Sequence, residues 1–360
     1  VEEGSITEGF YAEVGSFEIQ YFETLVEFGE FLSTNFPDES SISNAFPMTI
    51  ELANKPMQTG YIEDEDGYTV TAIEDYTFAP INDINNITTE EQELVLSILM
   101  GGRDYGPNTI TFPKTITNIG TYAFFCCTNL LMLDLSDNSN LVNIADYAVA
   151  FCTSLETIDL SNCTSLTSIP SLSGSSGVLK SVDLSGCLGI TSIGNSAFSS
   201  LNSLIYITLP PNLTSIGSSA FYDCYNLTSI TLPSSLETIG NSAFGGCYAL
   251  AEVYNYSENI EVTLGNTSSS TNGYLGRYAK VVYNANDLTG EKPASKIQTI
   301  DNVQYYVDGE DFVALAPSVA RNSLKTLSID SRTTEFSQYA FYDCNNLTEI
   351  NYNAVSVADL

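Results

Sequence analysis

The sequence predicts an α/β repeat solenoid, a stack of coils with short parallel strands along one face. Three observations predict it: one phrase recurs almost unchanged, its copies stand at regular intervals, and each copy ends in an apolar–polar alternation that stops at a proline. Because proline cannot donate to a strand ladder, each alternation is interpreted as one short strand. A single coil cannot bury its own apolar side, so we expect neighbouring coils to form the core together.

The repeated phrase is clearest in two consecutive copies. Residues 216–233 read IGSSAFYDCYNLTSITLP, and residues 239–250 read IGNSAFGGCYAL. The alanine of the Ala-Phe pair serves as a phase marker, with copies at Ala123, Ala148, Ala197, Ala220, Ala243 and Ala340 and a weaker copy at Thr77. Neighbouring copies are 23 or 25 residues apart and the longer intervals are near multiples, which predicts one coil per interval.

Residues 1–60 are expected to form an N-terminal cap of helix plus strand. Thr24 to Glu27 has the pattern of a capping box, and nearby apolar residues share one helical face, namely Leu25, Phe28, Phe31 and Leu32. A second helix is expected over Thr89–Met100, whose first turn is rich in glutamate, as the helix dipole favours. Solenoids need a capped end because the first coil would otherwise expose its core.

Residues 61–254 hold the regular leucine-rich coils of the predicted solenoid. One coil between Ala148 and Ala197 lacks the Ala-Phe side and carries a Ser/Gly run at 173–177, which predicts a short loop. The acidic run that ends in Asp66-Gly67 is interpreted as a turn, since it lacks the spacing of a calcium-binding loop.

Residues 255–323 are predicted to be an irregular insertion, and residues 324–360 a C-terminal repeat. Within the insertion, Asp308-Gly309 lies between two alternating stretches and predicts a β-hairpin. The repeat phase resumes at Leu324, which stands 16 residues before Ala340, as Leu227 stands before Ala243 (340 − 324 = 243 − 227). The insertion therefore interrupts the repeats without ending them.

The repeated wording I-G-x-x-A-F-x-x-C-x-x-L-x-x-I-x-L-P resembles the BspA-like, Treponema pallidum-type leucine-rich repeat of microbial surface proteins. The resemblance extends from Ile73 to Tyr352. It implies a right-handed leucine-rich-repeat coil and a secreted or surface-exposed, non-enzymatic protein. Some members of that family adhere to host matrix proteins or to other microbes. No signal or anchor sequence is recognised in the chain, so the expected location rests on the resemblance.

Composition excludes several classes of function. With 44 acidic and 11 basic residues, the formal charge is −33, which repels nucleic-acid backbones and anionic lipid headgroups. No apolar run approaches the length of about 20 residues that spans a bilayer. The sequence has no histidine, which removes the commonest catalytic base and every histidine-containing metal site. No carboxylate pair stands out for glycoside hydrolysis, so we expect neither an enzyme nor a cofactor.

The cysteines are expected to be buried, reduced thiols. Five of them occupy the same slot of the repeat: Cys127, Cys152, Cys224, Cys247 and Cys344. In the coil that begins at Ala197 the slot holds Leu201, which indicates an apolar site. Cys126 stands beside this ladder and is expected to be exposed. Since no two C-x-x-C pairs occur, a zinc site is not expected.

The candidate ligand-binding residues lie at one strand position. Asp134, Asp159 and Asp183 each precede Leu-Ser, at intervals of 25 and 24 residues (159 − 134 and 183 − 159). Stacked strands would place them about 4.8 Å apart, where like charges repel. Hydration, a cation, or a lysine or arginine of a partner could relieve that repulsion. In later coils the same position holds neutral residues: Thr208, Thr231 and Tyr254.

Two functions follow as hypotheses. The first is adhesion or protein–protein interaction through this strand face, with a host matrix or surface protein, or a neighbouring cell's macromolecule, as partner. The alternative is a carbohydrate-binding surface protein that uses a tyrosine-rich end, formed by Tyr222, Tyr225, Tyr248, Tyr254 and Tyr256. Packing of these tyrosines against the repeats is the competing interpretation. Salt should weaken the first kind of binding and hardly affect the second.

Overall fold

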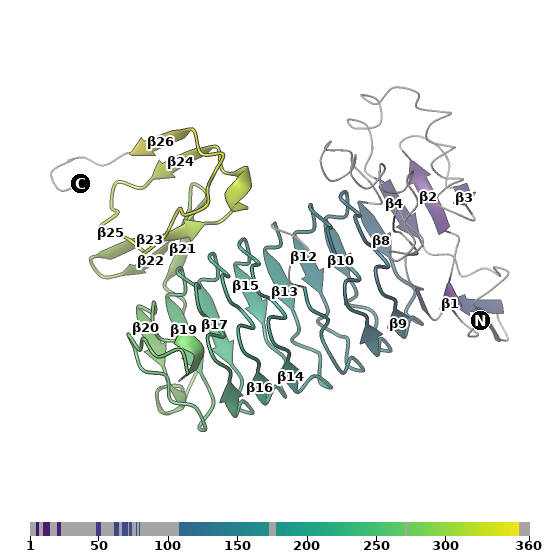
Figure 1. Ribbon diagram of the computed structural model, residues 1–360, viewed down its shortest axis with the longest axis horizontal. Helices are drawn as coiled ribbons and strands as arrows, with labels where there is room; N and C mark the ends of the chain where they lie inside the picture. Colours follow the sequence, from purple (N-terminus) through teal and green to yellow (C-terminus); the bar gives the residue numbers. More distant parts are fainter. Residues whose placement is uncertain are drawn as a thin grey trace. The chain divides into compact units, whose positions relative to one another are not determined.

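In the computed structural model, the described residues are short segments before residue 80 and the stretches 108–172, 178–270 and 272–352. The chain forms two compact units. The strands of both units are labelled in Figure 1. The first unit holds residues 1–176 and 186–189, and the second holds residues 177–185 and 190–360. In each unit, every repeat contributes one or two short strands.

The first unit combines parallel strand rows with an N-terminal antiparallel sheet. One row runs β1-β7-β9-β11, and a second consists of the parallel pair β10 and β12. A further sheet runs β3-β2-β4-β8, antiparallel except between β4 and β8. The strands are β1 (Ser5–Ile6), β2 (Phe10–Val14), β3 (Gln20–Phe22), β4 (Met48–Glu51), β5 (Tyr61–Asp64), β6 (Gly67–Val70), β7 (Ala72–Ile73), β8 (Thr109–Thr111), β9 (Asn118–Ile119), β10 (Met132–Asp134), β11 (Asn143–Ile144) and β12 (Thr157–Asp159).

The helical part of the predicted cap is not supported. The described residues among the first 60 are the strands β1 to β4, and the expected helices over 24–32 and 89–100 lie outside the described residues. Across the part of the chain that is described, helix is limited to three short 3-10 turns. The turn predicted at the acidic run is confirmed, because β5 and β6 form a hairpin that pairs Asp64 with Gly67.

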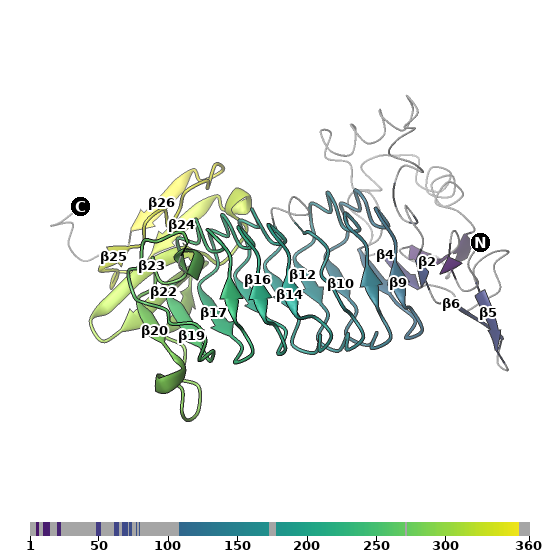
Figure 2. The ribbon, with the colours of Figure 1, turned by 60° about the horizontal axis from the view of Figure 1, so that its bottom comes forward.

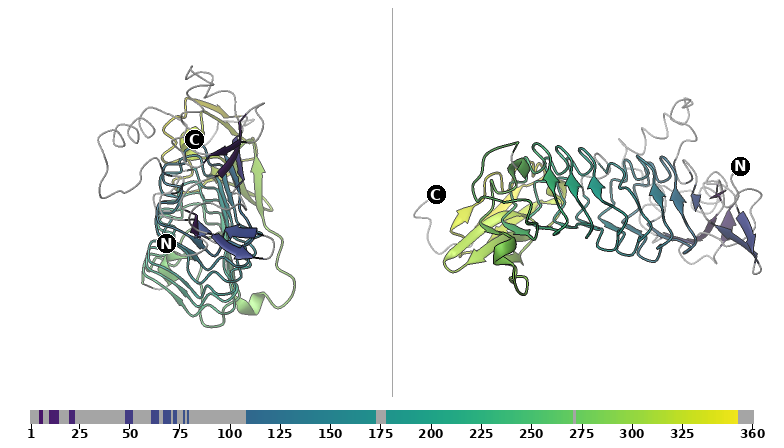
Figure 3. Two further views of the ribbon diagram at one scale, coloured as in Figure 1. Left: turned by 90° about the vertical axis from the view of Figure 1, so that its right-hand side faces the viewer. Right: turned by 90° about the horizontal axis from the view of Figure 1, so that it is seen from below.

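The second unit continues the coils and then adds the insertion and a last coil. Its parallel rows are β13-β15, β14-β16-β18 and β17-β19-β20, seen from further directions in Figures 2 and 3. The elements are β13 (Ser181–Asp183), β14 (Ser192–Ile193), β15 (Tyr206–Thr208), β16 (Ser215–Ile216), β17 (Ser229–Leu232), β18 (Thr238–Ile239), β19 (Glu252–Asn255), η1 (Asn272–Tyr274), β20 (Val281–Tyr283), η2 (Ala285–Asp287), β21 (Ile297–Ile300), β22 (Val303–Asp308), β23 (Asp311–Pro317), η3 (Arg321–Ser323), β24 (Thr326–Ile329), β25 (Glu335–Phe336) and β26 (Glu349–Tyr352).

The repeat phrase folds as predicted into stacked parallel coils with an apolar interior. In β17 the side chains alternate, so that Ile230 is buried while Thr231 reaches the outer face. The phenylalanines of the Ala-Phe slot stack in a ladder, with ring centroids 5.2 Å apart for Phe198 and Phe221 and 5.1 Å for Phe221 and Phe244. Each coil thus buries the face that its neighbour could not bury alone.

The predicted hairpin is confirmed and is part of a larger sheet. Strands β22 and β23 pair antiparallel, closed by Asp308 opposite Asp311, and Gly309 takes the left-handed conformation that such a turn needs (φ 62°). Strand β21 adds antiparallel to β22, and β25 adds parallel to β23. The last coil, β24 with β26, packs its Leu327 and Ile329 against Tyr305 and Phe312 of the hairpin.

The eight cysteines are free thiols, and all but the half-buried Cys344 are buried. The expectation that Cys126 is exposed is wrong: it has no exposed surface, and burial raises its pKa to about 12. Five thiols donate to a backbone carbonyl oxygen of the preceding coil, at Sγ···O distances of 3.0 to 3.4 Å, from Cys152, Cys163, Cys187, Cys224 and Cys247. Three of these, Cys152, Cys224 and Cys247, belong to the predicted slot, whose buried and hydrogen-bonded thiols therefore serve the fold.

Candidate binding face

The predicted aspartates lie on the outer face of the short strands. In the first unit, Asp134 of β10 stands directly opposite Asp159 of β12. In the second unit, Asp183 of β13 stands opposite Thr208 of β15. Their strand neighbours on the other side of the pleat are buried, for example Leu133 beside Asp134, so the strands hold these polar groups in rigid register.

Each aspartate also shapes the turn that follows its strand. One carboxylate oxygen, Oδ1, accepts the backbone N–H two residues on, at 3.0 Å for Asp134, 2.9 Å for Asp159 and 2.9 Å for Asp183. This is an Asx turn, which satisfies a backbone donor where the ladder ends. The other oxygen of each carboxylate has no hydrogen-bond partner among the described residues. One half of each side chain therefore serves the fold, and the other half faces outward.

The role of the aspartates in these turns was not predicted from the sequence, although the residues that follow them indicate it. The coils with aspartate at this position continue with Leu-Ser, whereas the coils with Thr208 and Thr231 continue with Leu-Pro. Proline presets the turn that the aspartate otherwise stabilises, and Leu213 N–H donates to the Pro210 carbonyl there. Asp-Leu-Ser and Thr-Leu-Pro are therefore two sequences that form the turn after the strand at the same position of the repeat.

Within the second unit, the strand positions that follow Thr208 are covered by the chain itself. Thr231 of β17 stands opposite Tyr254 of β19. Lys292, from the connecting segment 288–296, donates from Nζ to Thr231 Oγ1 at 2.9 Å and lies 4.1 Å from the centre of the Tyr254 ring. Tyr254 is only 1% exposed. The expectation that Tyr254 belongs to an open surface is therefore wrong, because the insertion folds back over it.

Glu252 completes this covered end and was not predicted from the sequence. Its carboxylate is buried and accepts hydrogen bonds from Tyr254 Oη at 3.0 Å, Ser295 Oγ at 2.8 Å and the backbone N–H of Lys296 at 2.6 Å. These donors fix the connecting segment across β19. The sequence pattern does not reveal these partners, because Ser295 and Lys296 lie more than 40 residues away along the chain.

The tyrosine-rich end is mostly an internal contact, so the packing interpretation holds for its central members. Tyr225 stacks on Tyr248 with ring centroids 5.5 Å apart, and Tyr342 of the last coil meets Tyr225 edge-on at 5.6 Å. Arg321 lies over the Tyr225 ring at 5.5 Å. Tyr222 alone of the cited cluster keeps a large exposed fraction, 41%. Tyr254 is closed to a carbohydrate by burial, whereas Tyr225 and Tyr248 are half-buried and are engaged by these ring and guanidinium contacts.

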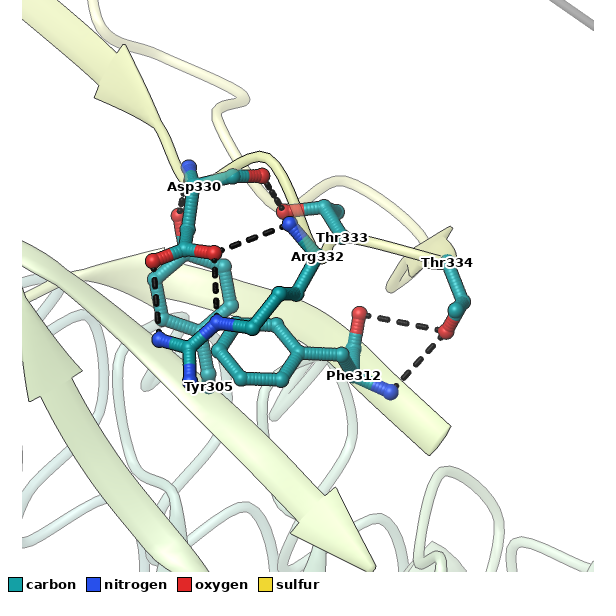
Figure 4. A network of polar contacts seen from close by, with 6 residues as sticks. All are labelled: Tyr305, Phe312, Asp330, Arg332, Thr333 and Thr334. Carbon is teal, nitrogen blue, oxygen red and sulfur yellow. Dashed lines mark hydrogen bonds and ion pairs between the residues drawn. The ribbon is translucent and has the colours of Figure 1, made fainter. Parts of the chain in front are cut away.

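A second polar network, around Asp330, holds a turn against the hairpin (Figure 4). Arg332 donates from Nε to Asp330 Oδ1 at 2.8 Å and from its backbone N–H at 2.9 Å, and these hydrogen bonds lower the pKa of Asp330 to about 2. The Arg332 guanidinium lies 4.5 Å from the Phe312 ring centre. Because the acid and base neutralise each other, this network explains the turn and offers no free charge to a ligand.

Within the described stretches, no group of three or more Cys, Asp or Glu side chains is placed to hold a metal ion. The same residues include no helix that is both long enough and apolar enough to span a bilayer. The outer strand positions therefore offer carboxylates, hydroxyls and the covered ring of Tyr254.

Stacked parallel coils with apolar ladders inside and polar side chains outside define a solenoid repeat protein. Six copies of the BspA type leucine rich repeat region match the chain, over residues 105–186, 175–271 and 318–358. These ranges cover more than half of the sequence, and the chain belongs to this BspA type leucine-rich-repeat family. No curated protein matches it.

Several solved structures resemble the chain at low identity. A leucine rich cell surface protein from Faecalibacterium prausnitzii A2-165 is 20% identical, with a TM-score of 0.37 and coverage of 85% of this chain and 72% of its own. A leucine-rich repeat protein from Bacteroides ovatus ATCC 8483 is 18% identical, with a TM-score of 0.43 over 85% of this chain and 64% of its own, so the chain spans less than two thirds of that protein. The T. pallidum leucine rich repeat protein is 24% identical, with a TM-score of 0.31 over 59% of this chain and 75% of its own.

Proposed function

We propose that the chain is a non-enzymatic, secreted or cell-surface binding protein that contacts another macromolecule through its outer strand face. The partner is a protein of the host or of a neighbouring cell, and the contact mediates adhesion or protein–protein interaction. The observation that carries the proposal is the set of half-used carboxylates at Asp134, Asp159 and Asp183, each with one oxygen committed to its own turn and one turned outward. Membership of a repeat family that includes surface proteins supports the location.

The charge of the chain points to a basic partner surface. A formal charge of −33 gives long-range attraction to cationic patches and repels other anionic surfaces. Carboxylates held rigidly on strands lose little side-chain entropy when a lysine or arginine binds them, which favours specific over diffuse attraction.

The test replaces each face aspartate with asparagine. Asparagine keeps an Oδ1 that can accept the Asx-turn hydrogen bond, so Asp134→Asn, Asp159→Asn and Asp183→Asn remove charge and leave the turn intact. Binding of the purified chain to a panel of extracellular matrix proteins and glycans is measured at low and at physiological salt. Asp146→Asn is the matched control, since Asp146 lies outside the strand face and its Oδ1 also accepts a backbone N–H, that of Ser171.

We expect salt-sensitive binding to a protein, reduced at least tenfold in the triple variant and unchanged in the control. Equal binding by the triple variant would remove the aspartates from the contact. Salt-insensitive capture of a glycan would favour the carbohydrate alternative, which the burial of Tyr254 makes the weaker one at that end.

A further inference from the structure

Lys292 is held differently from the neighbouring lysines of the second unit. Lys280 and Lys296 pair with carboxylates, at 2.9 Å from Glu335 and 2.6 Å from Asp308. Lys292 instead meets a hydroxyl, Thr231 Oγ1, and the face of an aromatic ring, Tyr254, and among the described residues no carboxylate lies within ion-pair distance of it. An aromatic face attracts an ammonium group, and a hydroxyl oxygen beside it can accept one of its N–H bonds.

A buried negative charge lies behind this arrangement. Glu252 is 1% exposed, and its hydrogen-bond donors in the described part of the chain are two hydroxyls and one backbone N–H, none of which carries charge. A buried carboxylate without a countercharge favours a cation nearby. Lys292 keeps an exposed surface, but partial desolvation lowers its pKa, and the charge of Glu252 acts against that shift.

Lys292 and the three residues around its ammonium group lie in different kinds of structure. Thr231, Glu252 and Tyr254 lie on β17 and β19, which pair in register along four residues each inside the stacked coils. Tyr283 of β20 stacks on Tyr254 at 5.3 Å and holds that ring in place. Lys292 comes from the connecting segment 288–296, which has no regular secondary structure. Thr231, Glu252 and Tyr254 therefore keep their positions if the Lys292 side chain moves away.

We propose that Thr231, Glu252 and Tyr254 form a binding pocket for a primary alkylammonium group, which the chain's own Lys292 fills and which a lysine side chain of a partner can enter in its place. The inference rests on the proposed function, because the pocket lies at the same strand position as the aspartates and names the partner group that this position accepts. Lys292 then acts as an internal competitor that sets how strongly the partner's lysine must bind.

The test uses n-butylammonium, which reproduces the end of a lysine side chain, with n-butanol as the neutral probe of similar shape. Lys292→Ala empties the pocket, and Lys280→Ala is the matched control that removes a lysine from a carboxylate pair in the same unit. Binding is followed by NMR through the ring resonances of tyrosine. We expect saturable binding of n-butylammonium to Lys292→Ala, at least tenfold weaker binding to the unaltered chain and to Lys280→Ala, and no binding of n-butanol.

Two further variants separate the pocket from general charge attraction. Glu252→Gln in the Lys292→Ala background removes the buried charge and should weaken n-butylammonium binding at least tenfold. If Lys292→Ala does not fold, the unaltered chain is titrated to high n-butylammonium, and a saturable shift of the Tyr254 ring signal is expected as Lys292 is displaced.

Folded Lys292→Ala with no saturable binding, or with equal binding of n-butanol, would overturn the proposal. The same holds for a Tyr254 signal that does not shift in the unaltered chain. These outcomes are distinct from failure of the proposed function, which is measured with protein partners and with the three Asp→Asn changes. If the chain binds a partner through the aspartates but does not bind n-butylammonium, the proposed pocket is refuted and the proposed binding face is still supported.

Discussion

At the scale of single residues, two positions in each regular coil hold a left-handed backbone. One precedes the alanine of the Ala-Phe slot and the other follows it by three residues, as at Ser219 (φ 55°) and Asp223 (φ 61°). Of the twelve such positions in the six coils, only Gly246 is glycine. There a Cβ would lie 2.2 Å from Asp223 Oδ1 of the preceding coil, so the contact with that carboxylate favours glycine in addition to the conformation. The other coils accept the cost of L-residues because the stack holds them in place.

The Asp330 network gives a prediction with a defined pH window. An aspartate in an unfolded chain has a pKa near 3.9, and the hydrogen bonds from Arg332 lower that of Asp330 to about 2 in the folded chain. A lowered folded pKa adds stability that is complete above the unfolded pKa and is lost as pH falls toward the folded one. We therefore expect Asp330→Asn to lower the thermal midpoint at pH 6 by a few degrees, with the difference shrinking between about pH 4 and about pH 2.

A double-mutant cycle checks that this difference comes from the ion pair. In an Arg332→Met background, the pH-dependent part of the Asp330→Asn effect should largely disappear, because the partner that lowers the pKa is gone. A gap between wild type and Asp330→Asn that stays constant from pH 6 to pH 2 would contradict the assignment.

At the scale of the element, the same repeat position is buried in a central coil and open in the last one. Ile230 of β17 is 1% exposed, whereas Ile350 of β26 is 62% exposed. Truncation of a buried isoleucine removes apolar contacts and leaves a cavity, but truncation at an exposed site costs little. We expect Ile230→Ala to reduce the free energy of unfolding by about 2 to 5 kcal/mol and Ile350→Ala by less than about 1 kcal/mol.

Urea unfolding of the two variants, followed by circular dichroism, provides the measurement. The pair is internally matched, since both changes remove the same atoms from the same slot of the repeat. Equal effects of the two changes would mean that burial of the slot does not decide its contribution.

Local patterns in the sequence predict the coils and the hairpin because their causes are local. Alternation places Ile230 inside and Thr231 outside, and Asp308-Gly309 closes β22 on β23. The covered end of the binding face depends instead on contacts between residues far apart, such as Lys292 with Thr231, 61 residues away. No periodicity reports such a contact, and for that reason Tyr254 was expected to be open. The Asx role of Asp134 is different, because the Leu-Ser and Leu-Pro wordings could have revealed it.

At the scale of the whole molecule, the few basic side chains of the second unit hold segments of the chain together. Lys280 and Lys296 pair with acids of other elements, Arg332 fixes a turn, and Lys292 covers the end of the binding face. A chain with 44 acids and 11 bases keeps a strongly negative surface after these pairs form. Its attraction to a basic partner should therefore weaken steeply with salt.

Among the described residues of the second unit, Arg321 makes the hydrogen bonds that span the most sequence, and it gives the last prediction. It is 2% exposed, and its Nε donates to Asn226 Oδ1 at 2.7 Å across 95 residues of sequence. Its Nη1 donates to the Tyr342 carbonyl and its Nη2 to the Tyr225 carbonyl. One guanidinium thus joins the last coil to the central coils at three acceptors.

Arg321→Met leaves those acceptors buried without a donor, at a cost of about 2 kcal/mol or more. Because the tie links the last coil to the rest of the unit, the loss should appear there first, as amide hydrogen exchange that is about thirtyfold faster over 326–352. Exchange in β15 to β17 should change little, since the Phe ladder there does not involve Arg321. Arg332→Met, at a guanidinium that is 62% exposed, is the control and should leave β26 near its original rate. Faster exchange spread evenly over both regions would mean that Arg321 supports the unit as a whole and does not latch the last coil.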